Sequence, residues 1–214
     1  MGPARLLALL VLAYLLGSVP TGLWLGKLVA GVDVRTVGSR RTGATNVTRT
    51  LGLGAGIAVG AVDVAKGFTA VALVAFLAGN PAAGALGGIA AIVGHNWPVF
   101  AGFRGGRGVA TAGGAFLAIC PPAFVCSMLC MAVAIAVTRY VSLGSIVAAV
   151  TGAIAATVAW RLHVAGDAAL LLAVPGSVLI VVRHADNIDR LVHGRERRLG
   201  QRASTPAPPL SAPT

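Results

Sequence analysis

The chain has 214 residues, of which 57% are hydrophobic and only 11% are charged, and its mean hydropathy is +0.86. A soluble core of this size cannot bury so much apolar surface, so the composition excludes an ordinary soluble domain and indicates an integral membrane protein. The net charge of +11 does not indicate nucleic-acid binding, because the basic residues stand between apolar runs. The positive-inside rule of membrane proteins explains their placement better.

The N-terminal segment, MGPARLLALLVLAYLLGSVPTG, places a basic residue before an apolar stretch, as a signal peptide does. No clear small-residue cleavage site follows, however, and the apolar run continues to Lys27. We therefore expect a first transmembrane helix that stays in the protein. The GSVPTG motif within it, residues 17–22, is open to two interpretations, a proline kink or a polar motif of a functional site.

The stretch GSRRTGATNVTRTLG, residues 38–52, has the composition of a phosphate-binding loop. Glycines let the backbone approach a ligand, hydroxyl and amide groups donate hydrogen bonds, and Arg40, Arg41 and Arg49 supply positive charge. Its first eight residues have the glycine spacing of a nucleotide-binding P-loop, but Ala44 stands where that loop needs lysine. A solvated basic loop between two membrane helices is the alternative interpretation.

Seven apolar runs follow one another along the chain, several of them shorter than the ~20 residues that a perpendicular span needs. They occupy residues 6–26, 53–78, 82–94, 108–119, 123–137, 143–160 and 168–182. Asn80-Pro81 and Pro121-Pro122 stand where a helix would be interrupted. If each pair lies within one long helix, the chain has five spans; if both divide two short helices, it has seven.

Charge distinguishes these two topologies. With five spans, Arg104 and Arg107 fall on the opposite side of the membrane from the loop at residue 38. With seven, nearly all basic residues share one side, and only Arg5 and Arg161 lie opposite. The positive-inside rule favours seven spans, with the N-terminus outside and the C-terminus in the cytoplasm.

Three further polar motifs then reach the cytoplasmic side. In GHNWPVFAGFRGGRGVAT, residues 94–111, a Gly-Gly pair between two arginines precedes a helix, which is the arrangement of an anion site. TRYVSLGSI, residues 138–146, is a short turn with two serines that are also suited to helix capping. RHADNIDRLVHGRERRLG, residues 183–200, carries His184, Asn187 and Arg190 at helical spacing.

In this order, GATN, GGRGVAT, TRYVS and RHxxNIxRL resemble the acyl-phosphate:glycerol-3-phosphate acyltransferase (PlsY) family of bacteria, over residues 17–200. The resemblance implies an all-α integral membrane protein, a bundle of seven transmembrane helices, several of them short, with active-site loops on the cytoplasmic face. It implies one polytopic acyltransferase domain over residues 1–200. The tail, residues 201–214, is rich in proline, alanine and serine and is expected to be disordered.

The implied reaction transfers a fatty acyl group from acyl phosphate to the 1-hydroxyl of sn-glycerol 3-phosphate. The products are lysophosphatidic acid and phosphate, in the first step of phospholipid biosynthesis at the bacterial inner membrane. The resemblance implies no cofactor, no metal and no nucleic acid. The implied partners are the two small-molecule substrates, membrane lipid and an upstream enzyme that forms acyl phosphate.

The resemblance also assigns roles to individual residues. The implied catalytic residues are His184, Asn187 and Ser142. The implied ligands of substrate phosphate are Ser39, Thr45, Asn46, Arg49, Gly105, Gly106 and Arg107. Two departures stand out: the usual GSGN is here Gly38-Ser39-Arg40-Arg41, and both usual lysines of FKGGKG are arginines.

Two alternatives are weighed against this interpretation. A transporter of organic phosphate or other anions would place charged groups near the bilayer midplane, where only Asp63 and Lys66 qualify. These residues are three apart on one helix face and are expected to neutralise each other. His184 and Asp189 fit the H-x4-D pattern of acyl-CoA-using acyltransferases, but residues five apart on a continuous helix point about 140° from each other. We therefore expect no pairing between them.

Overall fold

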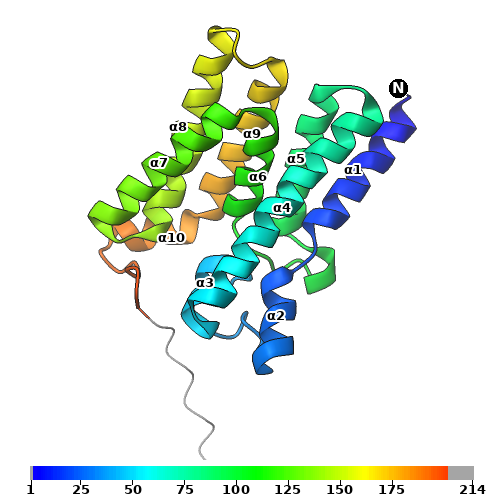
Figure 1. The fold of residues 1–214 in the computed structure, drawn as a ribbon. Coiled ribbons are helices and arrows are strands. Elements are labelled where there is room, and N and C mark those ends of the chain that lie inside the picture. The colour runs from blue at the N-terminus through cyan, green and yellow to red at the C-terminus, as the bar shows by residue number, and fades with distance from the viewer. Residues whose placement is uncertain (1, 202–214) are drawn as a thin grey trace, which may run out of the picture.

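The computed structural model describes residues 2–201, which form helices and loops without any β-strand (Figure 1). The α-helices are α1 (Pro3–Gly17), α2 (Thr21–Ala30), α3 (Ala44–Leu51), α4 (Leu53–Ala78), α5 (Pro81–Asn96), α6 (Val109–Ile119), α7 (Pro121–Thr138), α8 (Val141–Arg161), α9 (Asp167–Arg183) and α10 (Ala185–Val192), and a short 3-10 turn covers Val99–Ala101. The predicted all-α class is confirmed. Apart from Gln201, the tail predicted to be disordered lies outside the described residues.

Both predicted interruptions divide pairs of helices. Asn80 lies between α4 and α5, and its side-chain oxygen accepts a hydrogen bond from the Ala82 amide at 2.8 Å, which caps α5. Pro81 and Pro121 are the first residues of α5 and α7, a position where the missing amide hydrogen costs nothing. Each of the last six apolar runs therefore has its own helix, α4 to α9.

The first apolar run departs from the expected continuous helix. It makes one candidate span of 28 residues, Pro3–Ala30, but α1 ends at Gly17 and α2 starts at Thr21. The break has a local cause, because Val19 precedes a proline, and this disfavours helical backbone. The carbonyl of Val19, released from helical bonding, accepts a hydrogen bond from Lys66 Nζ at 3.1 Å.

Two other features of the helices were not predicted. The polar loop at residue 38 contains the short helix α3, and the last apolar helix bends by 57° where α9 meets α10. Within residues 2–201, four helical segments are long and apolar enough to cross a membrane, or five if α9 and α10 form one bent span. The predicted seven also counts α5 and α6, which are shorter.

The bundle is held together by close contacts between α4 and its neighbours α5, α6 and α1. A Cβ atom at Gly67 would collide with the Thr111 backbone, and one at Gly114 with the Val64 backbone, so glycine lets α4 and α6 approach closely. Exposed apolar side chains such as Phe76 lie on the outside of the bundle, as expected for a surface that faces lipid.

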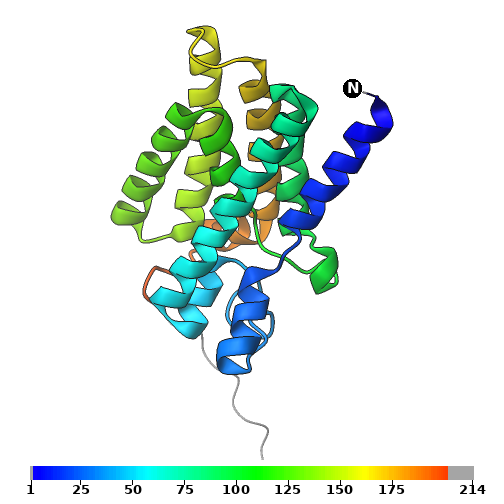
Figure 2. The same ribbon diagram turned by 45° about the vertical axis from the view of Figure 1, so that its right-hand side comes forward.

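The polar segments gather at one end of the bundle. In Figures 1 and 2, the N-terminus and the α8–α9 loop lie at one end, and α2, α3 and α10 lie at the other. The loops that precede α3 and α6 meet at this second end. A hydrogen bond joins them, from Arg35 Nη1 to the Ala101 carbonyl at 2.8 Å. This contact contradicts the five-span alternative, in which the two loops lie on opposite sides.

Candidate active site

The first loop of the candidate site is organised around the side chain of Asn46. Its oxygen accepts a hydrogen bond from the Ser39 amide at 2.8 Å. Its nitrogen donates to the carbonyls of Val34 at 2.8 Å, Arg41 at 2.9 Å and Val37 at 3.2 Å. Asn46 is buried, and both of its polar atoms are engaged within the loop. The side chain therefore fixes the path of the loop from residue 34 to α3.

The second loop, Gly102 to Gly108, packs against His95 at the end of α5. The Gly106 amide donates to the His95 carbonyl at 3.1 Å. A Cβ atom at Gly105 would collide with that carbonyl, and one at Gly106 with Nε2 of the imidazole ring. Only glycine fits at these two positions, which explains the Gly-Gly pair. Gly108, in the left-handed region at φ +78°, then turns the chain into the N-terminus of α6.

Arg183, the last residue of α9, fastens this second loop to the bundle. Its Nη2 donates to the carbonyls of Gly106 at 3.0 Å and Asn96 at 3.3 Å. Its guanidinium carbon lies 4.8 Å from the centre of the Trp97 ring, at cation–π distance. The end of α9 and the glycine-rich loop therefore have a fixed relative position.

His184 and Asn187 lie where α9 bends into α10, and both are buried. Nδ1 of His184 is 2.8 Å from the Ile180 carbonyl. Since a carbonyl only accepts, Nδ1 carries the hydrogen, and a neutral ring keeps its lone pair on Nε2. Asn187 Nδ2 donates to Glu196 Oε1 at 2.8 Å, and Arg190 Nε donates to Glu196 Oε2 at 2.7 Å.

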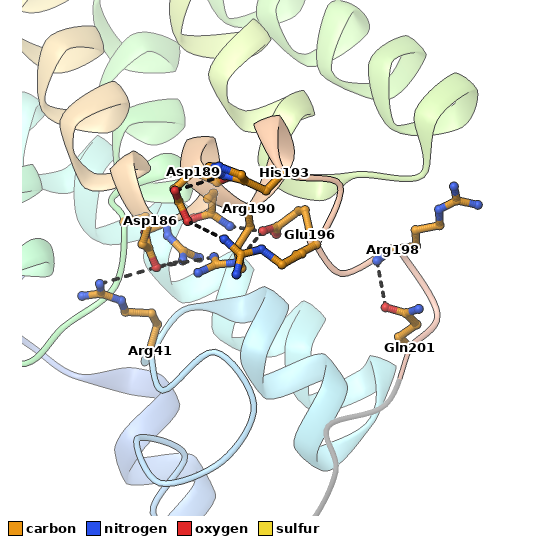
Figure 3. Close-up of polar contacts among 11 residues, drawn as sticks. Arg41, Asp186, Asp189, Arg190, His193, Glu196, Arg198 and Gln201 are labelled. Atoms are coloured by element: carbon orange, nitrogen blue, oxygen red, sulfur yellow. Dashed lines mark hydrogen bonds and ion pairs between the residues drawn. The ribbon is translucent and has the colours of Figure 1, made fainter.

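Asp186 is at the centre of an ion cluster that joins both loops to α10 (Figure 3). Its Oδ2 is 3.0 Å from Nη2 of Arg107, 3.5 Å from Nη2 of Arg190 and 3.8 Å from Nη2 of Arg41. Burial lowers the pKa of Arg107, and the charge of Asp186 opposes this shift. Asp189 pairs instead with His193 and Arg195, at 3.3 and 3.5 Å. This agrees with the expectation that Asp189 does not orient His184.

These elements enclose a cavity of about 300 Å³. Every predicted site residue except Gly105 lines it: Ser39, Thr45, Asn46, Arg49, Gly106, Arg107, Ser142, His184 and Asn187. Gly105 instead packs behind the loop, against His95. The rest of the wall is largely apolar and comes from α4, α6, α7 and α8, with Val64, Val109, Phe124, Met128, Met131 and Val141.

Three buried polar atoms of cavity-lining residues have no hydrogen-bond partner within residues 2–201. They are Nε of Arg107, Oγ of Ser142 and Oδ1 of Asn187. A buried polar group without a partner costs about 1–3 kcal/mol. All three belong to residues that line the cavity, which suggests that a polar ligand supplies the missing partners.

Sequence reasoning assigned no site role to Glu196, which also lines the cavity, or to Asp186, and it counted Arg41, another lining residue, only among the positive charges of the first loop. The basic neighbours of the two acids were visible, but their pairing depends on how α10 meets the loops. Arg40, counted among the positive charges of the first loop, is exposed and does not line the cavity.

The two charged groups of α4 near the cavity are paired with each other. Lys66 Nζ lies 2.8 Å from Oδ1 of the buried Asp63, as predicted, and His95 Nδ1 lies 3.6 Å from the same oxygen. This pairing leaves no unbalanced charge on α4 of the kind that a transporter would use. Within residues 2–201, no group of three or more His, Cys, Asp or Glu side chains is placed to hold a metal ion.

Known proteins share both the sequence and the fold. A family model described as Glycerol-3-phosphate acyltransferase matches residues 7–194. Glycerol-3-phosphate acyltransferase 3 of Dehalococcoides mccartyi (strain CBDB1) is 41% identical over 214 residues, covering 94% of this chain and 98% of the relative. Glycerol-3-phosphate acyltransferase of Clostridioides difficile (strain 630) is 42% identical over 200 residues, covering 90% and 94%.

Two solved structures of PlsY (YgiH), an integral membrane glycerol 3-phosphate acyltransferase, also match. The glycerol 3-phosphate form has a TM-score of 0.83 at 40% identity, covering 92% of this chain and 96% of that chain. The lysophosphatidic acid form has a TM-score of 0.81 at 39% identity, with the same coverage. The family model and these relatives span nearly the whole chain, so this chain belongs to the glycerol-3-phosphate acyltransferase (PlsY) family of integral membrane enzymes.

Proposed function

We propose that this enzyme transfers a fatty acyl group from acyl phosphate to the 1-hydroxyl of sn-glycerol 3-phosphate. The products are lysophosphatidic acid and phosphate. Membership of the family supports an acyltransferase, and the solved structures of PlsY are a glycerol 3-phosphate form and a lysophosphatidic acid form. The observation that carries the proposal is the cavity, which combines basic polar walls with an apolar wall. Such a cavity suits a ligand that has a phosphate at one end and a hydrocarbon chain at the other.

The basic walls offer two places for phosphate. Arg107 and Arg41 lie together beside Asp186. Arg49 lines the cavity from α3, where burial and the positive charge of Arg197 both lower its pKa. A phosphate dianion near either group would relieve the desolvation and repulsion of its arginines. Two substrates that each carry a phosphate account for both places.

The reaction needs positioning more than a reactive enzyme group. Acyl phosphate is a mixed anhydride, so its phosphate is a good leaving group and no covalent enzyme intermediate is required. The glycerol hydroxyl oxygen attacks the acyl carbonyl carbon, the bond from that carbon to the phosphate oxygen breaks, and phosphate leaves with the electron pair. The hydroxyl proton ends on a phosphate oxygen, which keeps charge and atoms in balance.

His184, Asn187 and Ser142 are proposed to orient the reacting groups. Nε2 of His184 and Oδ1 of Asn187 are free acceptors for the attacking hydroxyl, and the Ser142 hydroxyl is a free donor for the acyl carbonyl oxygen. Protonating His184 would create a buried imidazolium in a cavity that already holds several arginines. We therefore assign the proton to phosphate rather than to this ring.

The remaining predicted site residues bind substrate phosphate or shape the loops that do. Arg49, Arg107, Thr45 and the Ser39 hydroxyl supply charge and hydrogen bonds. Asn46, Gly105 and Gly106 act through the loop backbone, because the amide of Asn46 is engaged there and the glycines have no side chain.

The distribution of charge supports an orientation in the membrane, and the resemblance to the bacterial family supports the inner membrane. The enzyme is proposed to lie in the bacterial inner membrane, with its N-terminus outside and its C-terminus and cavity on the cytoplasmic side. Residues 1–200 form one acyltransferase domain in this proposal. An upstream enzyme supplies acyl phosphate, and the acyl chain of this substrate lies in the apolar part of the cavity, next to the surrounding membrane lipid.

A direct test uses purified protein in detergent with palmitoyl phosphate and glycerol 3-phosphate, followed by release of inorganic phosphate. We expect release only when both substrates are present. An absence of release under all conditions would contradict the proposal, and release from palmitoyl phosphate alone would indicate a hydrolase instead.

A further inference from the structure

Arg41 is a cavity-lining cation to which the family resemblance assigns no role. The family pattern GSGN has no arginine at this position, whereas here the guanidinium reaches from the first loop toward α10. Its side chain is 30% exposed, and Asp186, at 3.8 Å, is its only ion-pair partner within residues 2–201. This distance exceeds that of a hydrogen bond, so the contact holds Arg41 only loosely.

Asp186 cannot form a close ion pair with every cation around it. One carboxylate oxygen, Oδ2, faces the guanidinium groups of Arg107, Arg190 and Arg41, and only Arg107 approaches as close as 3.0 Å. Arg190 has a better partner in Glu196, at 2.7 Å. Arg41 and Arg107 therefore share a single oxygen, whereas a phosphate group offers several oxygens at once.

The charges of the cluster match a phosphate group. Glu196 pairs with Arg190, so Asp186 alone faces Arg41, Arg107 and Arg183. Arg49 and Arg197 add further positive charge close to Glu196 and Arg190, so the cations exceed the carboxylates by at least two. A phosphate monoester carries close to two negative charges at neutral pH. The Nε of Arg107, buried and without a partner, supplies a further free donor at the same place.

We propose that Arg41 is a ligand of a substrate phosphate in this enzyme, and that Asp186 holds its guanidinium beside Arg107 until that phosphate takes its place. The identity of the ligand as a substrate phosphate rests on the proposed function. On binding, the phosphate oxygens accept hydrogen bonds from both guanidinium groups. The side chain of Asp186 then rotates so that its carboxylate is hydrated by solvent at the cavity rim. Since Asp186 is 38% exposed, this exchange does not bury an unpaired charge.

The neighbouring residue provides a matched control. Arg40 has the same charge, stands next to Arg41 and is exposed outside the cavity. Within residues 2–201 its side chain takes part in no ion pair and no hydrogen bond. Arg40→Asn and Arg41→Asn therefore remove the same charge from the same loop. Only Arg41→Asn also removes a side chain that lines the cavity and contacts Asp186. Asparagine also tolerates the φ of +57° at Arg40.

The experiment measures KM for acyl phosphate and for glycerol 3-phosphate separately, with the full-length enzyme in detergent. We expect Arg41→Asn to raise one of these KM values by about 10- to 100-fold, as the loss of a charged hydrogen bond does. The substrate affected identifies which phosphate Arg41 binds. Arg40→Asn should leave both KM values within about twofold of wild type. Equal effects of the two variants would overturn the proposal.

Calorimetric titration with inorganic phosphate tests the same site without turnover. Wild type and Arg40→Asn should bind phosphate equally, and Arg41→Asn at least about tenfold more weakly. Asp186→Asn removes the competing carboxylate and should strengthen binding by up to about fivefold. Weaker binding by Asp186→Asn would refute the exchange. If wild type binds phosphate through Arg41 but transfers no acyl group, the proposed function fails while the phosphate site stands.

Discussion

The imidazole of His184 has one nitrogen available to a substrate, because Nδ1 is engaged by the Ile180 carbonyl. If Nε2 only accepts a hydrogen bond from the glycerol hydroxyl, another acceptor can replace it. We expect His184→Gln to keep kcat/KM within about tenfold of wild type and His184→Ala to lose about 10- to 100-fold. Steady-state kinetics with both substrates checks this. A loss of about 10²–10⁴-fold in kcat for both variants would instead identify His184 as the general base.

At the residue scale, the sequence was most informative where a motif requires one residue type for a physical reason. The place of Gly106 in the site could be predicted because the Gly-Gly pattern precedes a helix. The structure adds that a Cβ atom at this position would collide with His95. The roles of Asp186 and Glu196 could not be predicted. Both stand in a segment full of arginines, and only the bend between α9 and α10 decides which arginine each acid meets.

At the scale of the elements, the conformation of the first loop depends on one side-chain amide, that of Asn46. Asn46 donates to three carbonyls and accepts from one amide, all within the loop. Asn46→Asp keeps the acceptor but removes the donor, at a cost of about 1–3 kcal/mol for a buried carbonyl left unpaired. We therefore expect a lower thermal unfolding temperature in detergent and a loss of acyl transfer.

Asn80 provides the control for this change. Its side chain uses only its oxygen, to cap α5, and aspartate is an equally good N-cap. Asn80→Asp should therefore match wild type in both unfolding temperature and transfer rate. If Asn46→Asp and Asn80→Asp behave alike, the loop does not depend on the Asn46 amide.

Prolines explain which helix boundaries could be predicted. Pro81 and Pro121 begin helices, and the breaks before them were visible in the sequence. The break at Val19 and Pro20 remained open between a kink and a polar motif, because an isolated proline within an apolar run is compatible with both. Helix α3 was missed, since its eight residues are mostly polar and lie in a stretch rich in glycine.

For the whole molecule, the two ends of the bundle differ in charge, and this predicts its orientation. Arg104 is exposed on the second loop, at the end that carries α3 and α10, and Val164 is 66% exposed in the α8–α9 loop at the opposite end. In a background free of cysteine, Arg104→Cys should react with a membrane-impermeant thiol reagent only after cells are opened. Val164→Cys should react in intact cells, and the reverse pattern would refute the proposed orientation.

The choice between five and seven transmembrane spans could be made from charge alone, because only seven spans bring the basic loops to one side of the membrane. The contact between Arg35 and Ala101 confirms that they meet. The shortness of α5 and α6 was already visible in the runs at residues 82–94 and 108–119, but composition could not predict how these short helices are buried. Their burial depends on α4 and α9, which pack around them, and such packing is a property of the assembled bundle.

The central claim is that one cavity brings acyl phosphate and glycerol 3-phosphate together for direct transfer. The most direct measurement gives purified enzyme radiolabelled glycerol 3-phosphate with either palmitoyl phosphate or palmitoyl-CoA and follows labelled lysophosphatidic acid. We predict labelled product with palmitoyl phosphate and none with palmitoyl-CoA, and less product from Arg107→Ala at equal protein. Comparable product from both donors, or undiminished product from Arg107→Ala, would contradict this account.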